Sequence, residues 1–175
     1  MKRLLILMVV CVFSQIPSFA QDAPMATVGG GFSALTFKPS GATERTTPLG
    51  WQAGAEVRVW KFIGAVGDFG GQYEKPTGST TTFHFYEYLG GVRAHARMSK
   101  LDAFGHALWG GATGGGGGVS NSQFTMGYGG GADWSVNDSW AIRLAQVDWL
   151  PTRSNGLWEK NQVRFGFGVV WKAGK

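Results

Sequence analysis

Cysteine is almost absent from this chain of 175 residues: the one cysteine, Cys11, lies in an apolar run near the N-terminus. A chain with so little cysteine has no disulfide framework to hold a small core together. Helical patterning is missing too, since no segment shows a long apolar repeat with a period of 3.6 residues. We therefore expect helix to be a minor component and the stability to come from β-sheet.

The sequence also lacks the motifs for binding nucleic acids, metal ions and phosphate groups. The chain has 16 basic and 11 acidic residues, but it contains neither a run of basic residues nor the motif of a nucleic-acid-binding domain. We therefore expect no nucleic-acid partner. The three histidines, His84, His95 and His106, have no cysteine ligands or HExxH motif beside them, so we expect neither a metal nor a cofactor. The run "TGGGGG" at 113–118 lacks the Lys-Ser/Thr of a phosphate-binding loop and is expected to be a flexible loop.

The N-terminus has the organisation of a secretory signal peptide. Lys2 and Arg3 precede a short apolar run, and a Ser-x-Ala end closes it at Ala20. The apolar run is shorter than the ~20 residues that a membrane-spanning helix needs. We therefore expect a signal peptide over residues 1–20, removed on export, and a single mature domain over residues 21–175.

Glycine, by contrast, is abundant. It accounts for 29 of 175 residues, about 17%, against a usual share of ~7%. Many of these glycines lie inside segments with alternating polarity, where they would normally weaken a strand. A small closed barrel gives them a use, because tight curvature and a narrow lumen favour positions without side chains.

The stretch "GWQAGAEVRVW" at residues 50–60 shows the dominant pattern. Its odd positions are apolar and its even positions are mostly polar or charged, which is the period of two of a β-strand with two unlike faces. The same alternation predicts eight strands, near residues 27–37, 49–60, 63–74, 82–97, 101–113, 123–135, 140–150 and 162–172.

The connections between these strands alternate in length. Those near 61–62, 98–100 and 136–139 are tight, whereas those near 38–48, 75–81, 114–122 and 151–161 are longer and rich in Gly, Ser, Thr, Asn and Pro. Short turns on one rim and longer loops on the other are typical of an outer-membrane barrel. The predicted fold is all-β: an eight-stranded antiparallel up-and-down transmembrane β-barrel.

One strand departs from strict alternation. In "WAIRLAQVDWL", Arg143 is out of parity with Gln146 and Asp148. Keeping all three polar side chains on one face requires an extra residue, so we expect a β-bulge near Leu144 and Ala145.

The two faces differ sharply in chemistry. The uncharged face carries aromatic residues near both ends of the strands, which suits the interfacial girdles of a membrane barrel, and the polar face then lines the lumen. The expected girdle residues are Trp51, Tyr73, Trp134, Trp140 and Trp171. The expected polar network of the lumen is Glu56, Arg58, Asp68, Glu87, Arg93, Asp133, Arg143, Asp148 and Arg164.

With these features the chain resembles the small outer-membrane β-barrels related to the transmembrane domain of outer-membrane protein A. The segments "GDFGGQYE", "LGGVRAHAR", "FGHALWGG" and "GGGADW" carry the resemblance, which spans essentially the whole mature chain. It implies the outer membrane as location, outer-membrane lipids as partners and a monomer.

The last predicted strand, "RFGFGVVW", is similar to the assembly signal that the outer-membrane insertion machinery reads in this family. Arg164, Gly166, Val169 and Trp171 occupy its polar, glycine, hydrophobic and aromatic places. Family members often end on the aromatic residue, whereas four residues follow Trp171 here. The resemblance thus implies the insertion machinery as a partner, through this strand.

The lumen charges are expected to pair with one another rather than to conduct or catalyse. An eight-stranded barrel has an interior just wide enough for side chains, and buried charges persist by pairing and hydrogen bonding. We expect the carboxylates of Glu56, Asp68, Glu87 and Asp133 to pair with Arg58, Arg93, Arg143 and Arg164. A continuous pore is therefore not expected.

The favoured function is non-enzymatic: an integral barrel that supports envelope integrity or presents its loops to outside partners. The first alternative is an enzyme that hydrolyses or transfers acyl chains of lipid A or phospholipids at the outer rim, for which His84 is the only candidate base. The segment "TRSNG" is similar to part of a deacylase motif, but Thr152 stands where that motif has histidine, so Ser154 lacks a base. The second alternative, a soluble lipocalin-like barrel, requires the two faces to be reversed.

Overall fold

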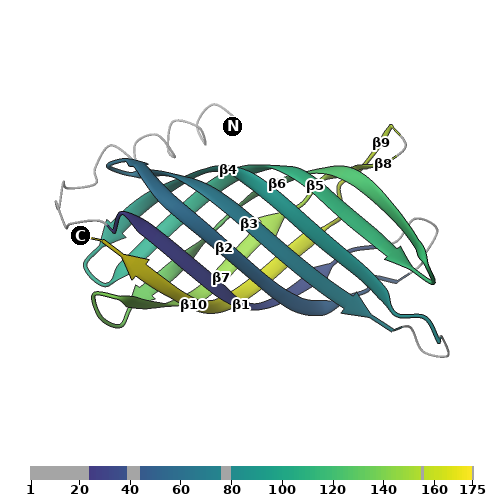
Figure 1. Ribbon diagram of the computed structural model, residues 1–175, viewed down its shortest axis with the longest axis horizontal. Coiled ribbons are helices and arrows are strands. Elements are labelled where there is room, and N and C mark those ends of the chain that lie inside the picture. The colour runs from purple at the N-terminus through teal and green to yellow at the C-terminus, as the bar shows by residue number, and fades with distance from the viewer. Residues whose placement is uncertain (1–23, 39–43, 76–79, 155, 175) are drawn as a thin grey trace, which may run out of the picture.

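In the computed structural model, antiparallel strands close into a long barrel (Figure 1). The structure describes residues 24–38, 44–75, 80–154 and 156–174. Eight strands form the wall: β1 (Ala26–Thr36), β2 (Leu49–Trp60), β3 (Ile63–Glu74), β4 (Phe83–Met98), β5 (Leu101–Gly116), β6 (Val119–Ser135), β7 (Trp140–Trp149) and β10 (Val163–Ala173). Pairing of β1 with β10 joins the two ends of this meander. The predicted all-β, eight-stranded barrel is confirmed.

The expected signal peptide over residues 1–20 lies outside the described residues. Within the described ranges, no helix is both long enough and apolar enough to cross a membrane.

The barrel has two unlike rims. The connections β2–β3, β4–β5 and β6–β7 are short and lie at the same end as the start of β1 and the end of β10 (Figure 1). We call this end the turn rim. The opposite end, the loop rim, carries the connections β1–β2, β3–β4, β5–β6 and β7–β10.

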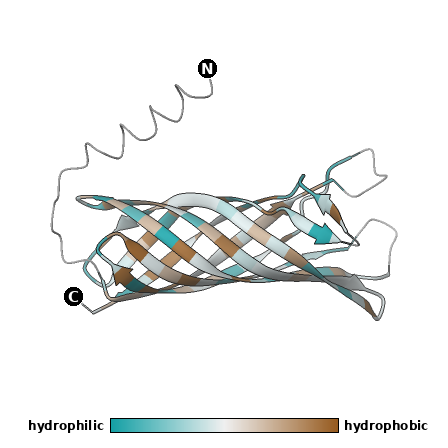
Figure 2. Ribbon diagram, turned by 90° about the horizontal axis from the view of Figure 1, so that it is seen from above, coloured by the Kyte–Doolittle hydropathy of each residue, from teal (hydrophilic) through white to brown (hydrophobic). Residues whose placement is uncertain are grey.

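Successive side chains alternate between lumen and exterior along every wall strand. In β7 the burial alternates strictly as far as Arg143, with Trp140 and Ile142 exposed and Ala141 and Arg143 buried. Figure 2 shows that polar and apolar residues are interspersed along the strands of the wall. The large apolar side chains lie mostly outside, and the buried side chains include many charges. The apolar face thus points outward, as the aromatic pattern predicted.

The predicted bulge in β7 is confirmed. Across from β6, Ala145 pairs with Ala132 and Arg143 pairs with Asp133, so Leu144 is an extra residue without a partner. Arg143 and Gln146 are consequently both buried, while Leu144 is exposed. The bulge keeps the three polar side chains of this strand in the lumen.

The prediction of a long loop over 114–122 is wrong. Strand β5 continues to Gly116 and β6 begins at Val119, so only Gly117 and Gly118 form the turn. Their φ angles are +64° and +86°, the left-handed values that a two-residue hairpin of the I′ type requires at both positions. The glycine run therefore supplies an extended strand end and then a tight turn, not a flexible loop.

The connection over 151–161 also contains structure that the sequence did not predict. Two short strands, β8 (Thr152–Ser154) and β9 (Leu157–Glu159), form a hairpin that pairs through β8 with Phe124 and Thr125 of β6. This hairpin projects from the loop rim (Figure 1). Strands of three residues carry too little alternation to be read from the sequence.

The lumen is not wholly polar. Leu35, Val66, Leu89, Leu108 and Leu150 form a buried apolar cluster, with Phe37 and Phe85 packed against it. Leu35 lies at the loop-rim end of β1, and Leu150 directly follows the loop-rim end of β7. The cluster therefore helps to fill the loop-rim half of the barrel with close-packed side chains.

Deletion of Leu144 tests the bulge. Without the extra residue, either Arg143 or the pair Gln146 and Asp148 must face lipid. An arginine on the lipid face costs up to about 2–4 kcal/mol at the bilayer midplane and less near an interface, and the lumen network also loses the displaced groups. We expect the deletion variant to fail to reach the compact form that runs anomalously on unboiled SDS gels. The control Leu144→Ala keeps the residue count and should fold; equal folding of both variants would contradict the assignment.

Candidate functional site

Arg164 of β10 is the centre of the polar lumen. Its side chain is 0% exposed. Its Nη1 lies 2.8 Å from Glu87 Oε1, and its Nη2 lies 2.7 Å from Asp68 Oδ1 and 2.6 Å from Asp148 Oδ2. One guanidinium therefore joins carboxylates from β3, β4 and β7, with an additional Nε bond of 3.0 Å to Asp148. Charge-assisted bonds of this kind are the strong ones among protein hydrogen bonds.

A hydrogen-bonded chain runs from this centre toward the turn rim. Asp148 Oδ1 lies 2.7 Å from Nε2 of His106, whose Nδ1 lies 3.4 Å from Nη2 of Arg93. Arg93 donates to Glu56 at 3.1 Å, and the other oxygen of Glu56 lies 2.6 Å from Nε2 of His95. The charge at the centre of the barrel is thereby connected to groups near its mouth.

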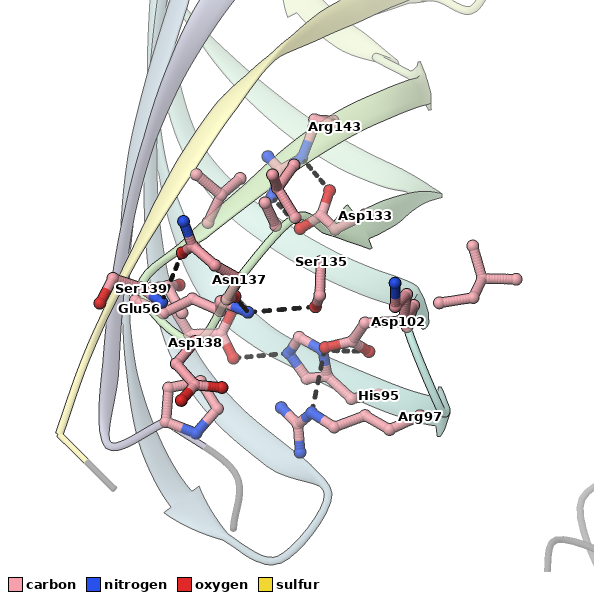
Figure 3. Close-up of a pocket in the computed structure, with 18 of the residues that line it drawn as sticks. Glu56, His95, Arg97, Asp102, Asp133, Ser135, Asn137, Asp138, Ser139 and Arg143 are labelled. Atoms are coloured by element: carbon pink, nitrogen blue, oxygen red, sulfur yellow. Dashed lines mark hydrogen bonds and ion pairs between the residues drawn. The ribbon is translucent and has the colours of Figure 1, made fainter. Parts of the chain in front are cut away.

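At the mouth, His95 is held between two carboxylates. Its Nδ1 lies 3.0 Å from Asp102 Oδ1, and Asp102 also accepts a bond of 3.0 Å from Nε of Arg97 (Figure 3). A second branch links Asp148 through Gln146 to Arg143 and Asp133. Every wall strand contributes at least one member to the connected network, here listed in chain order: Ser33, Glu56, Asp68, Gln72, Glu87, Arg93, His95, Arg97, Asp102, His106, Asp133, Arg143, Gln146, Asp148 and Arg164.

The two lumen histidines have different surroundings. Both ring nitrogens of His95 face carboxylate oxygens, and only an imidazolium can donate to both. His106 faces a carboxylate with Nε2 but a guanidinium with Nδ1. The geometry thus assigns a charged ring to His95 at the mouth.

A cavity of about 850 Å³ opens at the turn rim. Figure 3 shows Glu56, His95 and Asp102 on one side of it and Asp133 with Arg143 on the other. The guanidinium carbons of Arg93 and Arg143 lie 4.4 and 4.7 Å from the centroid of the Phe104 ring, so cation–π contacts brace this region. Deeper in the barrel, at Arg164 and Leu108, solvent has no access to the side chains.

The structure places most of the expected lumen network together. Glu56 pairs with Arg93, Asp133 with Arg143, and Asp68, Glu87 and Asp148 with Arg164.

Arg58 differs from the expectation, because it is half-buried at the turn rim and no described carboxylate lies within ion-pair distance of it. A register shift between Arg58 and Trp60 marks the end of regular pairing there. Conversely, Gln72 and Gln146 are central members that the sequence did not single out, although they share the parity of the charged positions.

The expected girdle residues lie on the outer surface near the two rims. Trp51 and Tyr73 lie toward the loop rim, where Trp51 Nε1 lies 3.5 Å from the Tyr73 hydroxyl and that hydroxyl lies 3.2 Å from Tyr86. Trp134, Trp140 and Trp171 lie toward the turn rim, and Trp140 pairs directly with Trp171. These positions match the two aromatic belts of a membrane barrel, and their place at the lipid interface stays a prediction.

The four positions of the expected insertion signal lie along β10 with two orientations. Arg164 and Gly166 face the lumen, whereas Val169 and Trp171 are exposed on the outer surface. Arg164 therefore has a place in the motif and also holds the central ion-pair cluster. Recognition of this four-residue motif by the insertion machinery stays a prediction.

The residues considered for catalysis and metal binding are not assembled into a site. His84 stacks against Tyr86 with ring centroids 5.3 Å apart, and no described serine hydroxyl hydrogen-bonds to it. The hydroxyl of Thr152 bonds to Thr125 and to the carbonyl of Leu150, not to Ser154. In the described part of the chain, no group of three His, Cys, Asp or Glu side chains is arranged to hold a metal ion.

Comparison with solved structures decides the architecture. The chain superimposes on the surface protein NspA of Neisseria with a TM-score of 0.70 at 11% identity, covering 88% of this chain and 100% of NspA. The chain folds as a small outer-membrane β-barrel. Among family models and curated sequences, nothing matches it.

Two further barrels give the same result. Ail, the attachment invasion locus protein of Yersinia pestis, matches with a TM-score of 0.58 at 15% identity, over 85% of this chain and 98% of Ail. The N-terminal β-barrel domain of Pseudomonas aeruginosa OprF matches with a TM-score of 0.50 at 11% identity, over 86% of this chain and 98% of that domain. At these identities the outer-membrane barrel fold is shared, and each protein's role has to be argued from its own residues.

Replacement of Arg164 tests the central cluster. Arg164→Leu leaves Asp68, Glu87 and Asp148 without their shared cation, and breaking a buried ion pair in this way costs about 3–5 kcal/mol. We expect a loss of that size in urea unfolding of the barrel in detergent micelles. The control Arg153→Leu removes an exposed arginine of β8 and should change stability little; equal effects would show that Arg164 is not the centre.

The protonation of His95 can be measured directly. We expect long-range ¹H–¹⁵N NMR spectra of the barrel in micelles at neutral pH to show two protonated ring nitrogens for His95, because both face carboxylates. The variant His95→Gln assigns the signals. Detection of an ordinary neutral ring at position 95 would refute the two-carboxylate geometry at the mouth.

Proposed function

We propose that this protein is an integral, non-conducting barrel of the outer membrane, with the turn rim toward the periplasm and the loop rim outside. Its role is to support the envelope or to present its loop rim to outside partners. The observation that carries the proposal is the fully buried cluster of Arg164 with three carboxylates, because it occupies the lumen with side chains bound to one another.

Physical reasoning supports a closed lumen. An ion crossing the barrel would have to displace Arg164 or its carboxylates, and separating a buried pair leaves charges without compensation. The apolar cluster around Leu89 and Leu108 offers a permeating ion no polar ligands in place of its water shell. A small closed barrel of this kind serves as a scaffold rather than as a channel.

The apolar outer surface of the barrel is evidence that the protein lies in a membrane. Exposed apolar side chains surround the wall, among them Phe32, Phe69, Val92, Phe165 and Phe167. A belt of this size would promote aggregation in water, whereas lipid tails satisfy it. We infer that outer-membrane lipids are direct partners, that the insertion machinery reads β10, and that the barrel is a monomer delivered by a cleaved signal peptide.

The two alternatives have less support. A lipocalin-like ligand barrel needs an apolar interior cavity, but the cavity of this barrel is lined largely by charged and polar groups and opens at the turn rim. An acyl hydrolase or transferase needs a base beside a nucleophile, and His84 contacts an aromatic ring. We therefore propose a protein without enzymatic activity.

The loop rim is the part best suited to outside contacts. The β5–β6 and β8–β9 hairpins extend there, and Trp158 of β9 meets Phe124 of β6 edge to face at 6.3 Å. Arg45 also binds the carbonyl of Asn161, which ties two connections together. The neighbour Ail has a structure in complex with a heparin analogue, sucrose octasulfate; for this chain we propose surface contact without assigning a ligand.

Conductance of the reconstituted protein tests the proposal. We expect planar bilayers containing the folded barrel to show no stable current steps across a range of voltages, since charged groups and leucines close the lumen. A gel shift between boiled and unboiled samples serves as the control for folding. Regular ohmic steps from shifted, folded protein would overturn the closed-lumen proposal.

A further inference from the structure

The tip of the β2–β3 hairpin carries four exposed apolar side chains. Val59, Trp60, Phe62 and Ile63 are all exposed, with Val59 at 71% and Trp60 at 70%. The register shift beside Val59 ends the regular alternation, so that Trp60 is exposed although the even-numbered residues before it in β2 face the lumen. Aromatic side chains exposed at a barrel rim typically lie at the level of lipid headgroups.

Basic side chains accompany these aromatic residues. A shallow cleft between this tip, the start of β1 and strand β4 is lined by Arg58, Lys61 and Arg97. The one acidic residue in its lining, Glu56, is already engaged by Arg93 and His95, and Arg97 pairs through its Nε with Asp102, so the excess charge comes mainly from Arg58 and Lys61. The cleft therefore presents an excess of positive charge beside exposed aromatic rings.

The backbone holds this arrangement in place. The amide of His95 donates to the carbonyl of Phe62 at 2.9 Å, and the amide of Arg58 donates to the carbonyl of Met25 at 2.9 Å. These bonds fix the hairpin tip against β4 and the start of β1. The cations are therefore presented from paired strand ends and not from a free loop.

We propose that this cleft binds the phosphate group of an anionic phospholipid in the inner leaflet of the outer membrane. Arg58, Lys61 and Arg97 contact the phosphate, and Trp60 and Phe62 lie along the glycerol and upper acyl region. The inference rests on the proposed membrane insertion, with the turn rim toward the periplasm. Arginine and lysine are the side chains best suited to phosphate oxygens.

The size of the cleft favours a lipid over a free anion. Its enclosed volume is only about 10 Å³, which is room for about one water molecule. A phosphate would thus sit over the mouth of the cleft, where the charges alone hold it weakly in water. A phospholipid gains additional contact with Trp60 and Phe62, and the membrane keeps it at high local concentration.

Lipid retention tests this site. Protein purified from membranes is placed in nanodiscs of phosphatidylcholine with added phosphatidylglycerol, and native mass spectrometry identifies the phospholipids that stay bound. We expect the wild type to retain phosphatidylglycerol selectively and Arg58→Gln/Lys61→Gln to lose the preference, by about fivefold for each basic residue removed. The control Lys38→Gln/Lys75→Gln removes the same charge at the loop rim and should keep the preference.

The possible outcomes separate the two proposals. Insertion of a folded barrel with no lipid preference, or an equal loss in the control variant, overturns the site and leaves the membrane proposal intact. Failure of the wild type to enter nanodiscs overturns both. Competition by inorganic phosphate alone at similar concentration overturns the assignment to lipid.

A second measurement covers the case in which the double variant does not fold. For the wild type, raising the salt concentration should weaken the preference for phosphatidylglycerol, because screening reduces contacts between exposed charges. A preference that is independent of salt would contradict binding through Arg58, Lys61 and Arg97.

Discussion

One buried guanidinium organises this barrel. Arg164 is shut off from water and lies within ion-pair distance of Asp68, Glu87 and Asp148, so its position fixes where three other strands must be. The hydrogen-bonded chain through His106 and on to the turn rim extends this constraint to the whole wall. Buried ion pairs are often weak contributors to stability but can specify one arrangement among several. In a barrel whose outer face only has to be apolar, we infer that the lumen network specifies strand register.

The fold and the closed lumen follow from this arrangement together with the apolar exterior. In a membrane the hydrophobic effect does not favour one packing of the outer face over another. The contacts that distinguish one strand register from another therefore have to lie in the lumen. The bulge at Leu144 is an example. Leu144 has no partner residue in β6, and this irregularity keeps Arg143, Gln146 and Asp148 in the lumen. The turn rim holds a cavity lined by charged and polar groups, whereas leucines pack closely deeper in the barrel.

Much of the fold was readable from the sequence, because alternation reports directly on which face a residue occupies. The eight wall strands, the outward aromatic face and the bulge at Leu144 all follow from which residues occupy alternate positions along each strand. Parity does not tell which residues meet across the lumen, so the convergence of three carboxylates on Arg164 and the role of Gln72 needed the structure. Glycine has no polarity to alternate, which is why the extension of β5 to Gly116 was missed. Arg58 keeps the alternation of its strand, but alternation could not tell that no carboxylate would lie within ion-pair distance of it at the turn rim.

The central claim is that the apolar face meets lipid and the charged face meets the lumen. All 8 tryptophans lie outside residues 1–23, and those on the wall, such as Trp51, Trp109 and Trp171, are exposed on the outer surface. The most direct test is fluorescence of the reconstituted protein in bilayers whose acyl chains carry bromine, a quencher confined to the membrane. We expect strong quenching by these lipids and weak quenching by acrylamide in the water. Strong quenching by acrylamide with no effect of brominated chains would contradict it.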